Sequence, residues 1–255
     1  GDYVLGPGDE FRLLFTGKEL KEVDVFVDNE GQVLVPDMGL VPAAGLRFNE
    51  FKTMLASKTK QKSIGFELDH IATTNLRTIR VFLLGNVRKP GTHTISAMSS
   101  VMQLLLDTGG ILPVGSLRTL QIKRGGLPDK NLDLYNVLIG GKNDGDLRLQ
   151  DGDTVFVPTI GKTIALTGTV KKPAIYELSN EKNIDEALQL AGGMLPNSQS
   201  IKVERISKNK NRIVVDLDLR DSASLHAAIK SGDIVHVLPA SNARKDTITL
   251  MGYVE

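Results

Sequence analysis

The sequence contains no cysteine among its 255 residues. This absence excludes structural disulfides, thiolate zinc sites, iron–sulfur clusters and a cysteine nucleophile together. No run of residues approaches the ~18 apolar residues with which a helix spans a bilayer. An excess of one charge is also missing, because 31 Lys and Arg stand against 30 Asp and Glu, a net charge of +1. Without a basic field to neutralise phosphates, nucleic acid is not an expected partner.

The sequence also lacks the residue patterns of common enzymes and metal sites. It has neither the Gly-x-Ser-x-Gly turn of a serine nucleophile nor the Gly-x-x-x-x-Gly-Lys loop that holds phosphates. None of the four histidines stands at metal-ligand spacing from another. An EF-hand loop that began at Asp144 would have Leu149 in place of the required Gly and Val155 in place of the required Glu. We therefore expect no enzymatic activity, no cofactor and no metal ion.

What the sequence does contain is a long internal repeat. Residues 81–96 read VFLLGNVRKPGTHTIS, residues 164–179 read IALTGTVKKPAIYELS, and residues 248–255 begin the pattern again as ITLMGYVE. The glycines at the fifth position of these segments are 83 and then 84 residues apart. This spacing suits a small domain and is too long for a solenoid unit. We predict a tandem of like modules, with a third copy that continues beyond this sequence.

Each full copy carries the same short helix and a similar order of strands. Ser100 with Gln103 in the first copy, and Asn183 with Glu186 in the second, form the pattern of a capping box. A glycine pair suited to a left-handed cap follows each helix. The strands expected after the helix are 119–124, 131–138 and 154–158 in the first copy, and 201–206, 212–219 and 234–239 in the second. The order predicts an α+β fold, in which each copy is a β-grasp-like module that packs one helix on one mixed sheet.

The first 80 residues differ from the repeats. They open with Tyr3-Val4-Leu5-Gly6-Pro7-Gly8-Asp9, whose glycines and proline indicate a turn. Strands are predicted at 11–15, 23–28, 32–35, 66–72 and 78–84. The second and third of these strands are predicted to pair as a hairpin. Asn49 is predicted to cap a helix whose apolar face includes Phe51 and Leu55.

This ordered set of segments resembles the bacterial polysaccharide export family of Wza-type outer-membrane exporters. The opening motif, the segment from Gly31 to Pro36 and Gly45 resemble the N-terminal polysaccharide-export domain of that family. The repeats resemble its soluble-ligand-binding β-grasp (SLBB) modules through Gly85-Asn86-Val87-Arg88-Lys89-Pro90-Gly91, Gly109-Gly110, Gly168-Thr169-Val170-Lys171-Lys172-Pro173 and Gly192-Gly193. The resemblance implies four parts: an export domain at 1–80, SLBB modules at 81–163 and 164–247, and the start of a third module at 248–255.

The resemblance implies the periplasmic portion of a non-catalytic outer-membrane exporter, part of an oligomeric conduit for capsular or extracellular polysaccharide. The implied partners are the polysaccharide, other copies of the chain in a homo-oligomeric ring, and an inner-membrane polysaccharide co-polymerase. Family members typically carry a lipid-bearing N-terminal cysteine and often a C-terminal amphipathic helix. This sequence has neither, so we expect the anchor to lie outside it. The alternative is a periplasmic or surface protein that binds a glycan or soluble ligand and forms no conduit, although such a protein would not require the export domain.

Two basic pairs are the candidate contact residues. Arg88-Lys89 and Lys171-Lys172 stand at the same place in both copies, just before Pro90 and Pro173. One hypothesis is that these side chains contact an anionic polymer or a neighbouring subunit. The other is that they are solvated charges at a hairpin tip, where lysine discourages pairing between sheet edges. Exposed charge is the usual state at turns, and it favours the second hypothesis.

Overall fold

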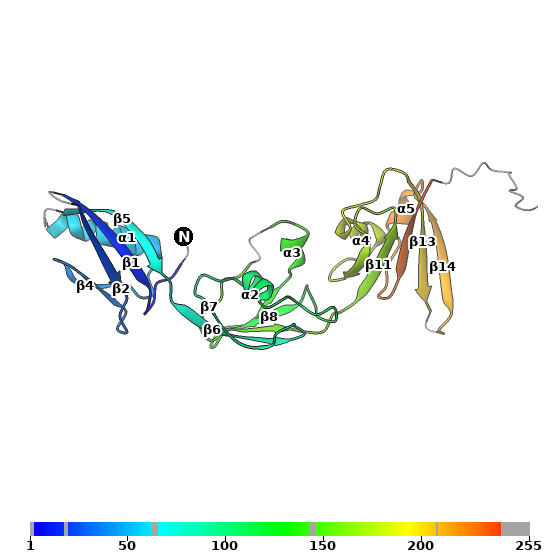
Figure 1. Ribbon diagram of the computed structural model, residues 1–255. Coiled ribbons are helices and arrows are strands. Elements are labelled where there is room, and N and C mark those ends of the chain that lie inside the picture. The colour runs from blue at the N-terminus through cyan, green and yellow to red at the C-terminus, as the bar shows by residue number, and fades with distance from the viewer. Residues whose placement is uncertain (1–2, 18–19, 63–65, 143–145, 208, 241–255) are drawn as a thin grey trace, which may run out of the picture. The chain divides into compact units, whose positions relative to one another are not determined.

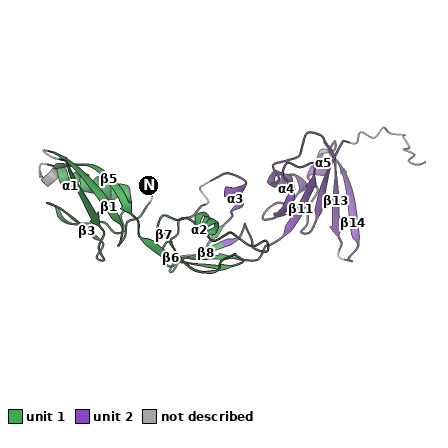
Figure 2. Ribbon diagram, viewed as in Figure 1, with its two compact units in different colours: residues 1–112, 121–132, 144–157 green, residues 113–120, 133–143, 158–255 purple. Residues whose placement is uncertain are grey.

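The computed structural model describes residues 3–17, 20–62, 66–142, 146–207 and 209–240 (Figure 1). The third copy expected at 248–255 lies outside these residues. The chain divides into two compact units (Figure 2). Unit 1 contains residues 1–112, 121–132 and 144–157, and unit 2 contains residues 113–120, 133–143 and 158–255. Within the described ranges, no helix is long and apolar enough to cross a membrane.

The N-terminal part of unit 1 is a small sheet covered by one helix. Strands β1 (Glu10–Gly17), β2 (Lys21–Phe26) and β5 (Phe66–Asn75) form an antiparallel sheet in the order β2-β1-β5, and β3 (Gln32–Val35) pairs with β4 (Gly39–Pro42). Helix α1 (Phe48–Lys62) packs on β5. Phe11, Leu13 and Phe15 alternate along β1 and are buried, and the ring of Phe11 lies 6.0 Å from that of Phe51 on α1. This alternation places the core between the sheet and the helix.

One local prediction for this part is confirmed only in part, and another is wrong. The expected hairpin forms at its turn, where Val27 and Val33 make an antiparallel bridge and the N–H of Asp28 donates to the carbonyl oxygen of Gln32 at 2.8 Å. Beyond the turn, β2 pairs with β1 and β3 pairs with β4. Asp28 does form the expected turn, since its carboxylate accepts the N–H groups of Glu30 and Gln32. Asn49 is not a cap, because α1 begins at Phe48.

The two repeats have the same topology. The first contains β6 (Thr78–Gly85), β7 (Gly91–Ser96), α2 (Val101–Asp107), β8 (Leu120–Lys123), β9 (Lys130–Leu132), α3 (Tyr135–Leu138) and β10 (Thr154–Val157). The second contains β11 (Thr163–Gly168), β12 (Ala174–Glu177), α4 (Ile184–Leu190), β13 (Ser198–Ile206), β14 (Arg212–Asp218), α5 (Ser222–Leu225) and β15 (Ile234–Pro239). The sheet orders are β7-β6-β10-β8-β9 and β12-β11-β15-β13-β14. In each sheet the first and last strands of the repeat lie side by side and are parallel. The predicted α+β class is confirmed.

The helix termini follow the sequence signals. Ser100 accepts the N–H of Gln103 at 3.3 Å, and Asn183 accepts the N–H of Glu186 at 2.9 Å. All four residues of the two glycine pairs have positive φ, between 76° and 93°. The predicted N-caps and left-handed C-terminal caps are therefore both confirmed.

The expected strand at 131–138 is wrong in its second half. Strand β9 ends at Leu132, and the next residues form α3. The carboxylate of Asp133 accepts the N–H of Tyr135 at 2.9 Å, which starts a helical turn where the apolar residues had suggested a strand. An aspartate has the same role before α5, which was not predicted, since Asp221 accepts the N–H of Ala223 at 3.0 Å.

Candidate functional site

A tight turn follows the first strand of each repeat and carries the candidate basic residues. Gly85 and Gly168 have φ values of 88° and 81°. A Cβ atom would lie 2.2 Å from the carbonyl oxygen of Val157 at Gly85, and 2.0 Å from that of Val237 at Gly168. Only glycine allows so close an approach to the end of the last strand. The repeated glycine therefore fixes where each basic pair leaves the sheet.

The backbone of each basic pair is tied to the glycine pair that follows the helix. The N–H of Arg88 donates to the carbonyl oxygen of Gly110 at 3.1 Å, and that of Lys171 donates to Gly193 at 3.0 Å. The side chains of all four basic residues are exposed. Among the described residues, none of the four is paired with an acidic side chain. Each basic pair therefore lies in a turn whose backbone is held by hydrogen bonds, while its positive side chains have no acidic partner among the described residues.

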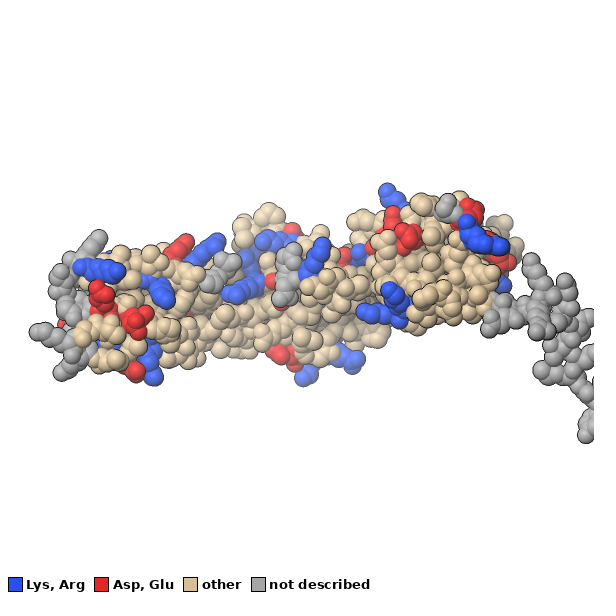
Figure 3. Space-filling model, turned by 90° about the horizontal axis from the view of Figure 1, so that it is seen from above, with Lys and Arg blue, Asp and Glu red and all other residues tan. Residues whose placement is uncertain are grey.

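The structure groups these four residues only within their own turns. Arg88 and Lys89 belong to unit 1, and Lys171 and Lys172 belong to unit 2. On the face shown in Figure 3, basic and acidic side chains are interspersed, without a field of one sign. On this face, contact with an anionic polymer would therefore depend on local turns and not on a general positive surface.

A second repeated feature is a turn that ends in a buried aspartate. Asp9, Asp153 and Asp233 are at most 1% exposed, and each follows a glycine with positive φ. Each carboxylate accepts the backbone N–H of the residue three positions earlier, at 2.8 Å in all three turns. The N-terminal part of unit 1 and both repeats therefore share one turn geometry.

An arginine neutralises each of these aspartates. The ion pairs are Arg77–Asp9 at 2.7 Å, Arg124–Asp153 at 2.7 Å and Arg205–Asp233 at 2.6 Å. Hydrogen bonds to the aspartates raise the pKa of Arg124 and of Arg205. Each arginine is remote from its aspartate in the chain, so local sequence patterns could not indicate the ion pairs. The available signal was the Gly-Asp pair that recurs at the start of a strand. These buried charges are paired and serve the fold.

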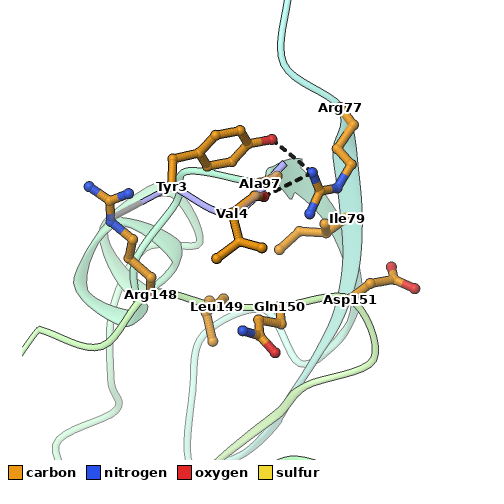
Figure 4. Close-up of a pocket in the computed structure, with 9 residues that line it drawn as sticks. All are labelled: Tyr3, Val4, Arg77, Ile79, Ala97, Arg148, Leu149, Gln150 and Asp151. Carbon is orange, nitrogen blue, oxygen red and sulfur yellow. Dashed lines mark hydrogen bonds between the residues drawn. The ribbon is translucent and has the colours of Figure 1, made fainter. Parts of the chain in front are cut away.

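A cavity of about 350 Å³ lies within unit 1, where the opening segment of the chain meets the first repeat. Val4, Ile79 and Leu149 give it an apolar floor (Figure 4). Arg77 and Arg148 stand on opposite sides of it in this view. None of the four predicted contact residues lines the cavity. Its walls come from distant parts of the sequence, so sequence patterns could not indicate it.

The polar side of this cavity is held by Tyr3 and Arg77. Arg77 Nη1 donates to the Tyr3 hydroxyl oxygen at 2.9 Å and to the carbonyl oxygen of Val4 at 3.3 Å (Figure 4). The Tyr3 hydroxyl donates to Asp9. Burial and then the Asp9 carboxylate raise the pKa of the Tyr3 phenol, so that it stays protonated. The exposed guanidinium of Arg148 has no acidic partner among the described residues, and it can receive an anionic or hydroxyl-bearing group.

Unit 2 contains a dense polar cluster around Glu177. This buried carboxylate accepts hydrogen bonds from the hydroxyl of Ser116 at 2.8 Å and from the N–H groups of Leu117 at 2.9 Å and Gly161 at 3.0 Å. Arg118 lies beside this site. It pairs with Asp133 at 3.0 Å and with Glu181 at 2.8 Å, and its guanidinium lies 4.7 Å from the ring centre of Tyr135.

The polar side chains in this cluster are hydrogen-bonded or ion-paired with one another. Burial raises the pKa of Glu181, but hydrogen bonds from the Ser179 N–H and from Arg118 outweigh that effect and hold the pKa below its ordinary value. No buried polar side-chain atom in the described part of the chain lacks a hydrogen-bond partner. Groups of three or more His, Asp or Glu residues that could hold a metal ion are also absent from the described ranges. The cluster therefore stabilises unit 2, and we assign it no ligand.

The comparisons with known proteins agree with this architecture. Residues 1–67 match the family model described as polysaccharide biosynthesis/export protein, and residues 80–131 and 163–216 match the model of the SLBB domain. The polysialic acid transport protein KpsD of Escherichia coli is 28% identical over 192 residues, which cover 74% of this chain and 34% of that protein. A second Escherichia coli protein of the same name gives the same figures. The chain thus spans about a third of the length of these curated relatives.

The fold and the matched models define a modular protein in which a polysaccharide-export domain precedes tandem SLBB modules. The chain belongs to the polysaccharide export family with SLBB repeats. This is the family that its opening motif and its repeated glycine segments had indicated.

Proposed function

We infer that this chain takes part in the export of a bacterial polysaccharide, as the periplasmic portion of an outer-membrane exporter. The observation that carries this proposal is the order of the matched parts, an export domain followed by two SLBB modules, in a chain that is 28% identical over 192 residues to a polysialic acid transport protein. In this function the chain contributes to an oligomeric conduit for capsular or extracellular polysaccharide and does not alter the polymer. The domain division at 80/81, 163/164 and 247/248 is part of the proposal.

The arrangement of charges supports a non-catalytic role. The carboxylates of Asp9, Asp153, Asp233 and Glu177 are buried, and each is paired with arginine or hydrogen-bonded to backbone and hydroxyl groups. Groups paired in this way stabilise a scaffold and are not poised to transfer a proton. The basic turns at Arg88-Lys89 and Lys171-Lys172 remain exposed. We propose that they contact the polymer or a neighbouring subunit of a homo-oligomeric ring, with an inner-membrane co-polymerase as a further partner.

Deletion of the gene in its own bacterium tests the export role. We expect polysaccharide to disappear from the cell surface and to accumulate inside the cell, and the full-length gene to restore its export. Electron microscopy of the purified full-length protein tests the conduit, which requires a closed ring. Normal surface polysaccharide in the deletion strain, together with glycan binding by the purified protein, would instead support the binding-protein alternative.

A further inference from the structure

The free edge of the second SLBB sheet differs from the other sheet edges in the repeats. Strand β14 lies at this edge, next to β13 (Figure 1). It is seven residues long, and its counterpart β9 in the first repeat has three residues. Ile213, Val214 and Val215 on β14 are 44%, 47% and 42% exposed. The second repeat therefore presents a long, largely apolar edge that the first repeat does not have.

The other edges carry the usual protection against strand pairing. Strand β7 begins directly after Pro90, and β12 begins directly after Pro173. Strand β9 is short and follows Pro128. Proline and short length keep an edge from adding another strand. No proline stands in or next to β14. An edge of this length without proline can accept a further strand by β-augmentation.

The hairpin geometry shows which backbone groups face the free edge. The N–H of Ser207 donates to the carbonyl oxygen of Asn211 at 2.8 Å and closes the hairpin between β13 and β14. Residues of an antiparallel pair alternate between bonding inward and facing outward. From the register of Ile206 opposite Arg212, the residues Arg212, Val214 and Asp216 direct their N–H and C=O groups away from β13. These three residues form the pairing edge.

The charges along this edge are self-complementary. Two copies of β14 that run antiparallel and cross at Val214 place Arg212 of each copy opposite Asp216 of the other. Opposite charges at facing positions stabilise a strand pair, and like charges destabilise it. In the same register Ile213 faces Val215, so exposed apolar side chains meet as well. Within the hairpin Arg212 pairs with Glu204, and Asp216 pairs with Lys202 at 3.7 Å. The side chains of Arg212 and Asp216 nevertheless remain 64% and 76% exposed, so each can also meet an opposite charge on a partner strand.

We propose that β14 is a homotypic interaction surface, on which a second copy of this chain pairs its own β14 antiparallel about Val214. The interface is isologous, because each copy contributes the same surface. It goes beyond the proposed export function, and it joins two chains through one continuous sheet of the second SLBB modules.

Analytical ultracentrifugation of this chain tests the pairing. We expect a monomer–dimer equilibrium that depends on concentration. Arg212→Asp alone and Asp216→Arg alone each place like charges at both facing positions, and each should raise the dimer dissociation constant about tenfold or more. An equal mixture of the two variants restores opposite charges at both positions. It should therefore form heterodimers as readily as the unmodified chain forms dimers, and native mass spectrometry identifies them by mass.

Two further variants separate pairing from folding. Val214→Pro removes an outward N–H and should abolish the dimer while the circular dichroism spectrum is preserved. Arg220→Asp changes an exposed charge in the same module outside β14 and should leave the dimer intact. A chain that stays monomeric throughout, or a mixture that associates no better than its components, overturns the proposal. Ring-sized assemblies that ignore these substitutions also overturn it, and they leave the proposed export function standing.

Discussion

Arg205 donates two hydrogen bonds to the buried carboxylate of Asp233, with Nε 2.7 Å from Oδ1 and Nη2 2.6 Å from Oδ2. The first repeat has the same arrangement, because both contacts between Arg124 and Asp153 measure 2.7 Å. In the first repeat the ion pair links the end of β8 to the turn before β10, and in the second repeat it links β13 to the turn before β15. The ion pair therefore joins two neighbouring strands at the point where the repeat closes.

Removal of the arginine should destabilise the second module strongly. Arg205→Ala leaves the Asp233 carboxylate buried without its partner, and breaking a buried pair in this way costs about 3–5 kcal/mol. Urea unfolding followed by circular dichroism measures the loss. Arg220→Ala is the matched control, since Arg220 pairs with Asp218 at the surface and its side chain is 81% exposed. Equal losses from the two variants would contradict the role assigned to the buried pair.

The repeated glycine should tolerate alanine far less well than another glycine of the same module. Gly168 and Gly193 both have positive φ, and this conformation costs an alanine about 1–2 kcal/mol. At Gly193 nothing lies within 4 Å of the added Cβ, whereas at Gly168 the carbonyl oxygen of Val237 lies 2.0 Å away. We therefore expect Gly168→Ala to lower the thermal unfolding temperature clearly more than Gly193→Ala. Similar shifts in unfolding temperature for the two variants would show that the backbone at Val237 can move away from the added Cβ at little cost in free energy.

Signals read from neighbouring residues predicted local structure well. The caps at Ser100 and Asn183 depend on residues three positions apart, and both form. The hairpin between β2 and β3 forms only at its turn, because beyond it β2 pairs with β1 and β3 pairs with β4, and spacing along the sequence does not show which strands become partners. The strand expected through residue 138 failed because Asp133 starts a helical turn at a point where apolar content alone cannot distinguish strand from helix.

The contacts of the candidate site depend on distant residues, and this limited what the sequence could show. Arg77 reaches Asp9 and Tyr3 across most of the export domain. Ser116 and Arg118 reach Glu177 and Glu181 from another part of the chain. No local pattern encodes such pairs. The basic turns were found because the repeat itself marks them, and their role in export stays a prediction.

Acid should weaken the cluster around Arg118. Because the pKa of Glu181 is lower in the folded chain than its ordinary value of 4.5, its stabilising contribution is complete above that value. The contribution is lost as the pH falls through the lower folded pKa. Glu181→Gln should therefore reduce stability at neutral pH and flatten its dependence on pH below 4.5. Urea unfolding at a series of pH values measures both effects. A variant with the same acid sensitivity as the unmodified chain would assign that sensitivity to other carboxylates.

Substitution of the basic turns should affect export and leave folding intact. The side chains of Lys89 and Lys172 are exposed, and backbone hydrogen bonds of Arg88 and Lys171 hold their turns. We expect Lys89→Ala combined with Lys172→Ala to reduce surface polysaccharide or ring assembly severalfold in the full-length protein. The circular dichroism spectrum and unfolding temperature should not change, because solvated charges contribute little to stability. Addition of Arg88→Ala and Lys171→Ala should deepen the defect.

The control for this prediction changes two exposed lysines outside the turns, Lys52→Ala and Lys182→Ala. Each set removes two positive charges. The turn set takes one from the first repeat and one from the second, and the control set takes one from the export domain and one from the second repeat. A defect confined to the turn variants would show that the position of the charge matters and not the net charge of the chain. Equal export by both sets would establish the turns as solvated tips that only discourage pairing between sheet edges.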